Sequence, residues 1–253
     1  MGVPDAALVA VAGLLAGAVN AVAGGGTLIV FPALLATGMP ALTANITSSV
    51  GLITGYAGGA FGYRRELTGQ TARLRALAVP ALLGGLSGAV ILLTTPAGSF
   101  RVVVPYLVLV ACLLLGVQPW LATWVTRRRA AVTGGSVTWP TRTGVFLAGA
   151  YGSYFGAGLG VLLLGVLGIL MPDDIQRTNA SKTLLSLGVN AVGIAVFVVS
   201  AQVSWGFAAI LLLTSCAGGI LGARVARLLP ATALRATVIT LGVVVAAVLI
   251  ASG

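Results

Sequence analysis

Long apolar runs, separated by short polar stretches, follow one another along the whole chain. A run of about 20 apolar residues is long enough to cross a lipid bilayer as an α-helix. The runs lie at about Ala6–Ala36, Ala41–Gly62, Leu74–Thr94, Val102–Val125, Thr143–Met171, Ile175–Ser200, Trp205–Leu221 and Leu234–Ala251. This pattern predicts an all-α membrane protein without a soluble domain.

Two of these runs are too long for one simple span, and glycine interrupts both. Ala6–Ala36 contains the glycine triplet 24–26, and Thr143–Met171 contains three glycines within residues 156–160. As helices, the limbs of the second run would be roughly 20 Å and 17 Å long, so neither crosses a hydrocarbon core of about 30 Å. The pattern predicts a re-entrant hairpin or a broken span in each half. Close helix packing also explains an isolated glycine triplet, but the matching break in the second half favours re-entrance.

The second half of the chain repeats motifs of the first at a nearly constant offset. Met39-Pro40 recurs 132 residues later, whereas Asn45-Ile46-Thr47 recurs as Asn179-Ala180-Ser181, 134 residues later. An insertion of two residues near Asp173-Asp174 explains the change. Internal repeats in so apolar a chain are typical of secondary transporters. The expected units are a first membrane repeat, a linker and a second membrane repeat at residues 1–125, 126–142 and 143–253.

The positions of the basic residues distinguish straight spans from re-entrant ones. Most Arg residues fall in three clusters between apolar runs, within residues 64–75, 127–142 and 224–235, and short basic loops tend to lie in the cytoplasm. If every run crossed the membrane, the third cluster would lie opposite the other two. If the glycine-broken runs return to their own side, all three clusters are cytoplasmic and both termini face outward. We therefore predict two inverted repeats, each a re-entrant or broken helix plus three transmembrane helices, joined by a cytoplasmic linker.

Composition agrees with a membrane location and argues against several functions. Hydrophobic residues make up 58% and charged residues 7% of the 253-residue chain, whereas soluble domains carry about a quarter charged residues. The net charge of +10 would suit a nucleic-acid partner, but its arrangement in short loops fits a cytoplasmic membrane face. The chain has no His, and its four acidic residues lie outside the apolar runs. We therefore expect a non-enzymatic protein with no nucleic-acid partner, no buried proton relay, no metal and no cofactor.

The glycine breaks are the expected substrate site. A short helix should follow each break, beginning at Thr27 in the first half and at Gly160 in the second. The first amides of a helix lack intrahelical acceptors, and the helix dipole is positive at that end. Two such ends, brought together by the repeat, would bind an anion through the backbone N–H groups of residues 25–28 and 158–161.

Polar side chains beside the breaks complete the expected site. The predicted substrate-binding residues are Asn20, Gly24, Gly25, Gly26, Thr27, Leu28, Asn45, Thr47, Ser48, Ser153, Tyr154, Gly158, Gly160, Asn179, Ser181 and Lys182. For the Ser and Thr residues, a hydrogen bond to a carbonyl of their own helix is an equally good explanation. Lys182 is the sole Lys of the chain, and it either faces the site or extends to the cytoplasmic surface.

Several of these motifs together resemble one family of bacterial membrane permeases. They are Gly24–Pro32 (GGGTLIVFP), Met39-Pro40, Ala44–Ser49 (ANITSS), Phe61–Arg65 (FGYRR), Gly218–Arg224 (GGILGAR), Pro230 and Arg235. In order and repetition they resemble the sulfite exporter TauE/SafE family over essentially the whole length. The resemblance implies an inner-membrane protein that moves small anions, typically sulfite, organosulfonates or related carboxylates, usually outward. It also implies roles for the glycine turn, Thr47 and Ser48, whereas the second half departs from the pattern because Lys182 replaces Ser48.

The expected function is therefore a secondary anion transporter that works by alternating access. The membrane potential could drive an anion outward, at about 2.3 kcal/mol per charge per 100 mV. The expected partners are a small anionic substrate and the lipid bilayer, and formation of a homodimer is left open. An anion channel would use the same lining, and a structural or accessory membrane protein would need no anion; both stay as alternatives.

Overall fold

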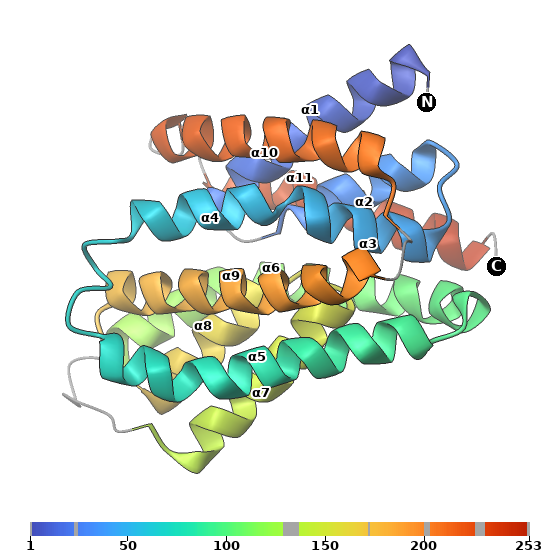
Figure 1. Ribbon diagram of the computed structural model, residues 1–253. Helices are drawn as coiled ribbons and strands as arrows, with labels where there is room; N and C mark the ends of the chain where they lie inside the picture. The colour runs from blue at the N-terminus through green and yellow to red at the C-terminus, as the bar shows by residue number, and fades with distance from the viewer. Residues whose placement is uncertain are drawn as a thin grey trace.

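The protein is a bundle of α-helices that follow the predicted apolar runs (Figure 1). The computed structural model describes residues 2–22, 25–128, 137–171, 173–199, 203–225 and 231–251, and these contain no strand. The helices are α1 (Val3–Val22), α2 (Thr27–Ala36), α3 (Ala41–Gly51), α4 (Ile53–Gly62), α5 (Thr71–Thr94), α6 (Ala97–Arg128), α7 (Trp139–Tyr154), α8 (Leu159–Leu170), α9 (Ile175–Val199), α10 (Trp205–Val225) and α11 (Ala231–Ala251). The described part of the chain is thus all-α, as the sequence predicts.

Helix length and apolarity fit a membrane protein. Among the described residues, α1, α5, α6 and α9 contain stretches long and apolar enough to cross a bilayer.

α3 and α4 together replace the single predicted run at 41–62 and meet at Leu52. The amide of Leu52 donates to the carbonyl of Ser48 at 3.0 Å, and its own carbonyl accepts from Tyr56 at 3.4 Å. These bonds carry the helical pattern across the junction, so α3 and α4 can serve as one span.

Each glycine-rich stretch forms a turn between two helices that fold back on each other. A Cβ added to Gly152 of α7 would lie 2.7 Å from the side chain of Leu159, and one added to Gly144 would lie 2.8 Å from Val166 of α8. Because the first contact lies close to the turn and the second lies farther along both helices, α7 and α8 are antiparallel and side by side. At the first break, a Cβ on Gly26 would lie 2.6 Å from the carbonyl oxygen of Ala16, so the chain turns back against α1. With 12 residues, α8 is about 18 Å long and does not cross the bundle.

The two ends of the bundle differ in what they carry. In Figure 1 the start of α1 and the end of α11 lie together at the right. The turn between α4 and α5, the end of α6 and the end of α10 lie at the left. The three Arg-rich stretches of the sequence are attached to these left-hand helix ends, although Arg129 and Arg227 themselves are outside the described residues. We call this the basic end of the bundle.

The halves of the chain pack against each other through glycine. α1 of the first half lies against α10 of the second, and α5 lies against α7. A Cβ on Gly84 would overlap the carbonyl oxygen of Phe146, and a Cβ on Gly218, its repeat equivalent, would overlap that of Leu14. Leu14 and Phe146 are themselves 132 residues apart. Repeat-related residues therefore make corresponding close contacts, which lipid favours because it provides no hydrophobic drive between helices.

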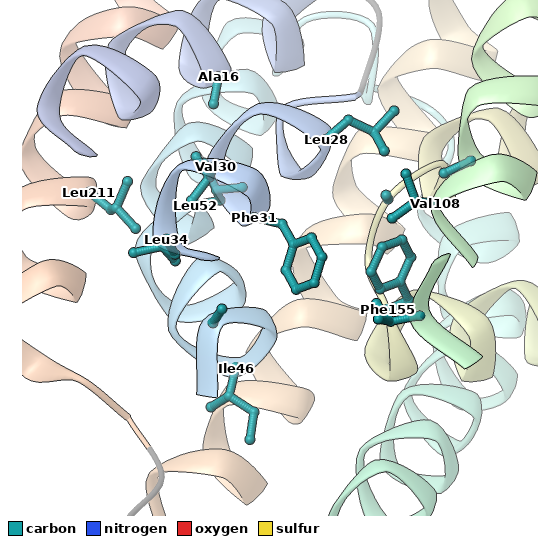
Figure 2. Packing of buried hydrophobic residues seen from close by; sticks show 14 of the residues in the cluster. Ala16, Leu28, Val30, Phe31, Leu34, Ile46, Leu52, Val108, Phe155 and Leu211 are labelled. Carbon is teal, nitrogen blue, oxygen red and sulfur yellow. The ribbon is translucent and has the colours of Figure 1, made fainter. Parts of the chain in front are cut away.

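A buried apolar cluster holds the centre of the bundle (Figure 2). It joins α2 to the second break and to α6 through Leu28, Phe31, Val108 and Phe155, each at most 2% exposed. Because helices of both halves contribute to this one cluster, the two halves share one core.

Adding one methyl group tests the glycine contacts. We expect Gly84→Ala to destabilise the protein by about 1–3 kcal/mol, because the backbone of α7 must move away. Gly58→Ala in α4 is the matched control, since nothing lies within 4 Å of its added Cβ, and it should be neutral or stabilise by up to about 1 kcal/mol. Thermal unfolding of both variants in one detergent measures the difference, and equal stability would contradict the close packing of α5 and α7.

Candidate functional site

The second break holds the start of α8 in a conformation that depends on glycine. Gly156 and Gly158 have φ angles of 85° and 87°, in the left-handed region that glycine adopts most readily. The helix begins directly after them at Leu159. The amides of Val161 and Leu162 donate to the carbonyl of Gly158 at 2.9 Å and 3.1 Å. The amide of Gly160 has no acceptor among the described residues, so it is available to a ligand.

The first break uses a side chain to stabilise its turn. Oδ1 of Asn20 accepts a hydrogen bond from the amide of Gly26 at 2.8 Å, and the amide of Leu28 donates to the carbonyl of Gly25 at 3.0 Å. The amide of Thr27 has no acceptor within the described part of the chain, and Gly24 lies outside that part. Most of the polar groups of this turn are thus engaged within the protein.

The two breaks meet through apolar side chains. Oγ1 of Thr27 lies 3.6 Å from the position of a Cβ on Gly156. Phe31 of α2 and Phe155 of the second break pack edge to face, with ring centroids 5.7 Å apart, and Figure 2 shows them side by side. Aromatic rings therefore occupy much of the contact between the breaks.

Several of the predicted polar side chains are committed to bonds within the protein. Asn45 Nδ2 donates to the carbonyl of Tyr154 at 2.9 Å, which ties α3 to the last residue of α7. The remaining bonds are Ser48 Oγ to the carbonyl of Asn45 at 2.8 Å, Ser153 Oγ to that of Val189 at 3.3 Å, Ser181 Oγ to Gln70 Oε1 at 2.8 Å, and the amide of Ser204 to Thr47 Oγ1 at 3.1 Å. Apart from the bond of Ser48, which lies within α3, these bonds hold helices and breaks together.

A small, partly enclosed cavity lies beside the second break and collects four of the predicted residues. Its volume is about 60 Å³, and its lining residues are Asn20, Gly55, Tyr56, Gly59, Tyr63, Gly160, Asn179, Lys182, Thr183 and Ser186. It therefore draws on α1, α4, α8 and α9, with both halves of the chain contributing. We call it the lysine cavity.

The polar groups of the lysine cavity are mainly hydrogen-bond donors without acceptors. Nδ2 of Asn20 and Oγ of Ser186 are buried and have no hydrogen-bond partner. The stem of Lys182 lies beside the start of α8, with Cδ 3.7 Å from the position of a Cβ on Gly160, and its ammonium has no acidic partner among the described residues. Burial, and next the carboxylate of Glu66, raise the pKa of Tyr63, so its hydroxyl stays protonated and can donate.

The charged side chain that lines the lysine cavity is positive. None of the four acidic residues of the chain lines it. A Lys ammonium and a helix N-terminus both favour a negative ligand. Chemically, this arrangement can bind an anion and offers no carboxylate or imidazole for acid–base chemistry.

A polar clasp joins the two halves at the basic end, next to the cavity. Arg73 of α5 pairs with Asp173 at 2.8 Å, and Arg177 of α9 reaches the same carboxylate oxygen at 3.3 Å. Gln70 Nε2 donates to the carbonyl of Arg177 at 3.2 Å, and its Oε1 accepts from Ser181. We call these five residues the clasp. Ser181 directly precedes Lys182, so the clasp and the cavity share one turn of α9.

The sequence prediction did not include all of the cavity-lining residues. Tyr56 and Tyr63 lie on α4 and just after it, in an apolar run that gave no signal of a site. Ser186 did have a signal, because Asn179, Lys182, Thr183 and Ser186 follow the spacing i, i+3, i+4, i+7 that marks one face of a helix. That polar face of α9 is the wall of the lysine cavity.

Comparison with known proteins matches this architecture to one family. The family model described as "Sulfite exporter TauE/SafE" matches residues 9–249. A probable membrane transporter protein of Haemophilus influenzae is 25% identical over 225 residues, which cover 88% of this chain and 86% of that protein. The probable membrane transporter protein YfcA of Escherichia coli K12 is 25% identical over 217 residues, covering 83% and 77%. The probable membrane transporter protein ORF9 of a Sinorhizobium species is 26% identical over 216 residues, covering 85% and 81%.

No solved structure matches the chain, so the family assignment depends on the sequence comparisons. The matched region contains both glycine breaks, the clasp and every residue of the lysine cavity. Together with the apolar helices, the match shows that the chain is a multi-pass membrane transporter and belongs to the sulfite exporter TauE/SafE family.

Proposed function

We propose that this protein is a secondary transporter that moves small anions out of a bacterial cell across the inner membrane. The proposed substrate is sulfite, as the family description suggests, or another small anion of similar chemistry, such as an organosulfonate or a related small organic anion. The observation that carries the proposal is the lysine cavity, where donors and one half-buried cation meet at a helix N-terminus without an acidic partner. Such a site is costly in a bilayer unless an anion occupies it.

The size of the cavity supports a compact substrate. About 60 Å³ corresponds to roughly two water molecules at their share of liquid volume. An anion with a few heavy atoms fits such a space, whereas a large one would need the helices to move apart. Lys182, Asn20, Ser186 and the amide of Gly160 would donate hydrogen bonds to the anion.

Alternating access is the mechanism that the two halves support best. We infer that residues 1–125 and 143–253 are inverted repeats, because Gly84 and Gly218 make corresponding contacts and the three basic stretches share one end of the bundle. In transporters of this kind, one half rocks against the other around a central site. The lysine cavity has walls from both halves, so such a movement would open it.

The clasp is the proposed gate on the cytoplasmic side. It joins the first half to the second with an ion pair whose side chains are 14% and 27% exposed. At the opposite end, the repeat equivalent of the contact between Gln70 and Ser181 is a single hydrogen bond between Ser204 and Thr47. Asp173 belongs to the two-residue insertion and has no equivalent in the first half. The ionic part of the gate, formed by Arg73, Asp173 and Arg177, therefore lies at the basic end.

Removing the cation tests the binding site. We expect Lys182→Gln to weaken apparent affinity for sulfite about ten- to a hundredfold, because one charge-assisted hydrogen bond contributes about 1.5–3 kcal/mol. Uptake of labelled sulfite by inside-out vesicles measures this, and Arg65→Gln, which removes a cation from an exposed turn, is the matched control. If the Lys182 variant transports sulfite like wild type, the anion does not bind in the lysine cavity.

Counterflow separates a transporter from a channel. Proteoliposomes preloaded with unlabelled substrate should take up labelled substrate transiently above equilibrium, with a rate that saturates, because a transporter must return its site across the membrane. A pore of the same lining gives neither saturation nor overshoot. A panel of sulfite, sulfonates and short carboxylates in the same assay identifies the substrate, and no uptake of any of them would favour an accessory protein.

Weakening the gate should expose the cavity from the cytoplasm. We expect Asp173→Asn to increase cytoplasmic labelling of a cysteine placed at Thr183 about fivefold, since a partly exposed ion pair contributes up to about 1 kcal/mol. The background lacks Cys112 and Cys216, and Asp5→Asn, at the opposite end of the bundle, is the control for loss of an acidic charge. An unchanged labelling rate would show that the clasp does not keep this side closed.

A further inference from the structure

A second cationic feature lies on the outer surface of the bundle, away from the lysine cavity. A groove of about 610 Å³ runs between α5 and α7, and its walls include Arg75, Val79, Leu83, Trp139, Arg142 and Phe146. These residues come from both halves of the chain. The groove belongs to no part of the proposed transport path, because none of them lines the cavity or takes part in the clasp.

The two arginines of the groove are free to bind an anion. Both are exposed, and neither guanidinium has a hydrogen-bond or ionic partner within the described ranges. Arg75 is in the second turn of α5, and Arg142 lies one turn into α7. Since α5 and α7 start at the basic end of the bundle (Figure 1), both charges lie where helices leave the membrane.

The groove becomes apolar below the arginines. Along α5, Arg75, Val79 and Leu83 follow at intervals of four residues and so share one face. Val79 is 61% exposed and Leu83 is 51% exposed. On the opposite wall Trp139, which is 76% exposed, stands at the level of the charges, where indole rings prefer the membrane interface. A positive mouth above an apolar wall matches a phosphate headgroup above an acyl chain.

The repeat shows that this chemistry is not needed for packing. The equivalents of Arg75, Trp139 and Arg142 are Ala209, Ala7 and Ala10. They lie on α10 and α1, which pack through the same glycine contacts as α5 and α7. The pair of α1 and α10 therefore packs without arginine or tryptophan at these positions, whereas the pair of α5 and α7 carries both at the basic end.

We propose that the groove between α5 and α7 binds an anionic phospholipid of the leaflet at the basic end. Its phosphate lies between Arg75 and Arg142, and an acyl chain follows Val79, Leu83 and Phe146. Basic pockets between membrane helices on the cytoplasmic side bind anionic headgroups through the same charge complementarity. Because α5 and α7 come from different halves, the bound lipid bridges the two repeats.

Lipid titration of the purified full-length protein tests this. We expect phosphatidylglycerol to raise the unfolding temperature in neutral detergent more than phosphatidylcholine does, and native mass spectrometry to show more bound phosphatidylglycerol. Replacing each arginine with Gln should weaken phosphatidylglycerol binding about fivefold, and the double variant roughly 25-fold. Arg65→Gln, an exposed cation at the same end but outside the groove, should leave binding unchanged.

Three outcomes would overturn the proposal. Equal binding of phosphatidylcholine would mean that the groove is an ordinary apolar surface. Stabilisation by inorganic phosphate that the double variant abolishes would mean a free-anion site. A change of oligomeric state in the double variant, without a change in lipid preference, would mean that a second copy of the chain covers the groove. If the double variant is too unstable to purify, the comparison of the two lipids on the wild-type protein still decides.

Discussion

The structure depends on how it satisfies the backbone where its helices break. Lipid offers no hydrogen bonds, so a break at membrane depth is tolerated only where protein or water supplies them. At the first break the side chain of Asn20 accepts from the amide of Gly26, and at the second the side chain of Asn45 donates to the carbonyl of Tyr154. The amide of Gly160 has no such partner among the described residues. The lysine cavity lies beside this amide, so the unsatisfied end of α8 and the donors around it belong to one site.

The repeat gives both halves one packing scheme but different chemistry. Gly84 and Gly218 make corresponding contacts, because close approach of helices needs the same small residue in each half. The side chains at the breaks follow no such rule. Lys182 stands where the first half has Ser48, and Tyr56 where the second half has Asn190. As a result the lysine cavity has a free helix N-terminus from the second break but a side chain, Asn20, from beside the first, and the aromatic pair of Phe31 and Phe155 packs between the two breaks.

Sequence patterns predicted the helices well because each apolar run has to be buried in lipid or protein along its whole length. The short helix after the first break begins at Thr27, as expected, and the second begins within one residue of the expected Gly160. The site was harder to predict, since a hydroxyl that binds a ligand and one that bonds its own helix look alike in sequence. Ser48 and Ser186 illustrate this: Ser48 donates to its own helix, whereas the hydroxyl of Ser186 has no hydrogen-bond partner and lines the cavity. Tyr56 and Tyr63 could not be found from the sequence, because only the packing of α4 against α9 directs them to Lys182.

Under the proposed function, the position of the clasp on α9 would connect gating to binding. Successive residues of a helix are rotated by about 100° from each other, at 3.6 residues per turn. Ser181 therefore faces Gln70 while Lys182 faces the cavity, and a stiff helix cannot move one without the other. Separation of the halves at Arg73 and Asp173 would carry α9 away from α4, and with it Lys182 away from Tyr56. A bound anion would attract the ammonium of Lys182 toward the cavity and so oppose the movement of α9 away from α4. Occupancy of the cavity and closure of the clasp should therefore favour each other. By thermodynamic linkage, the closed clasp must then strengthen anion binding by the same factor.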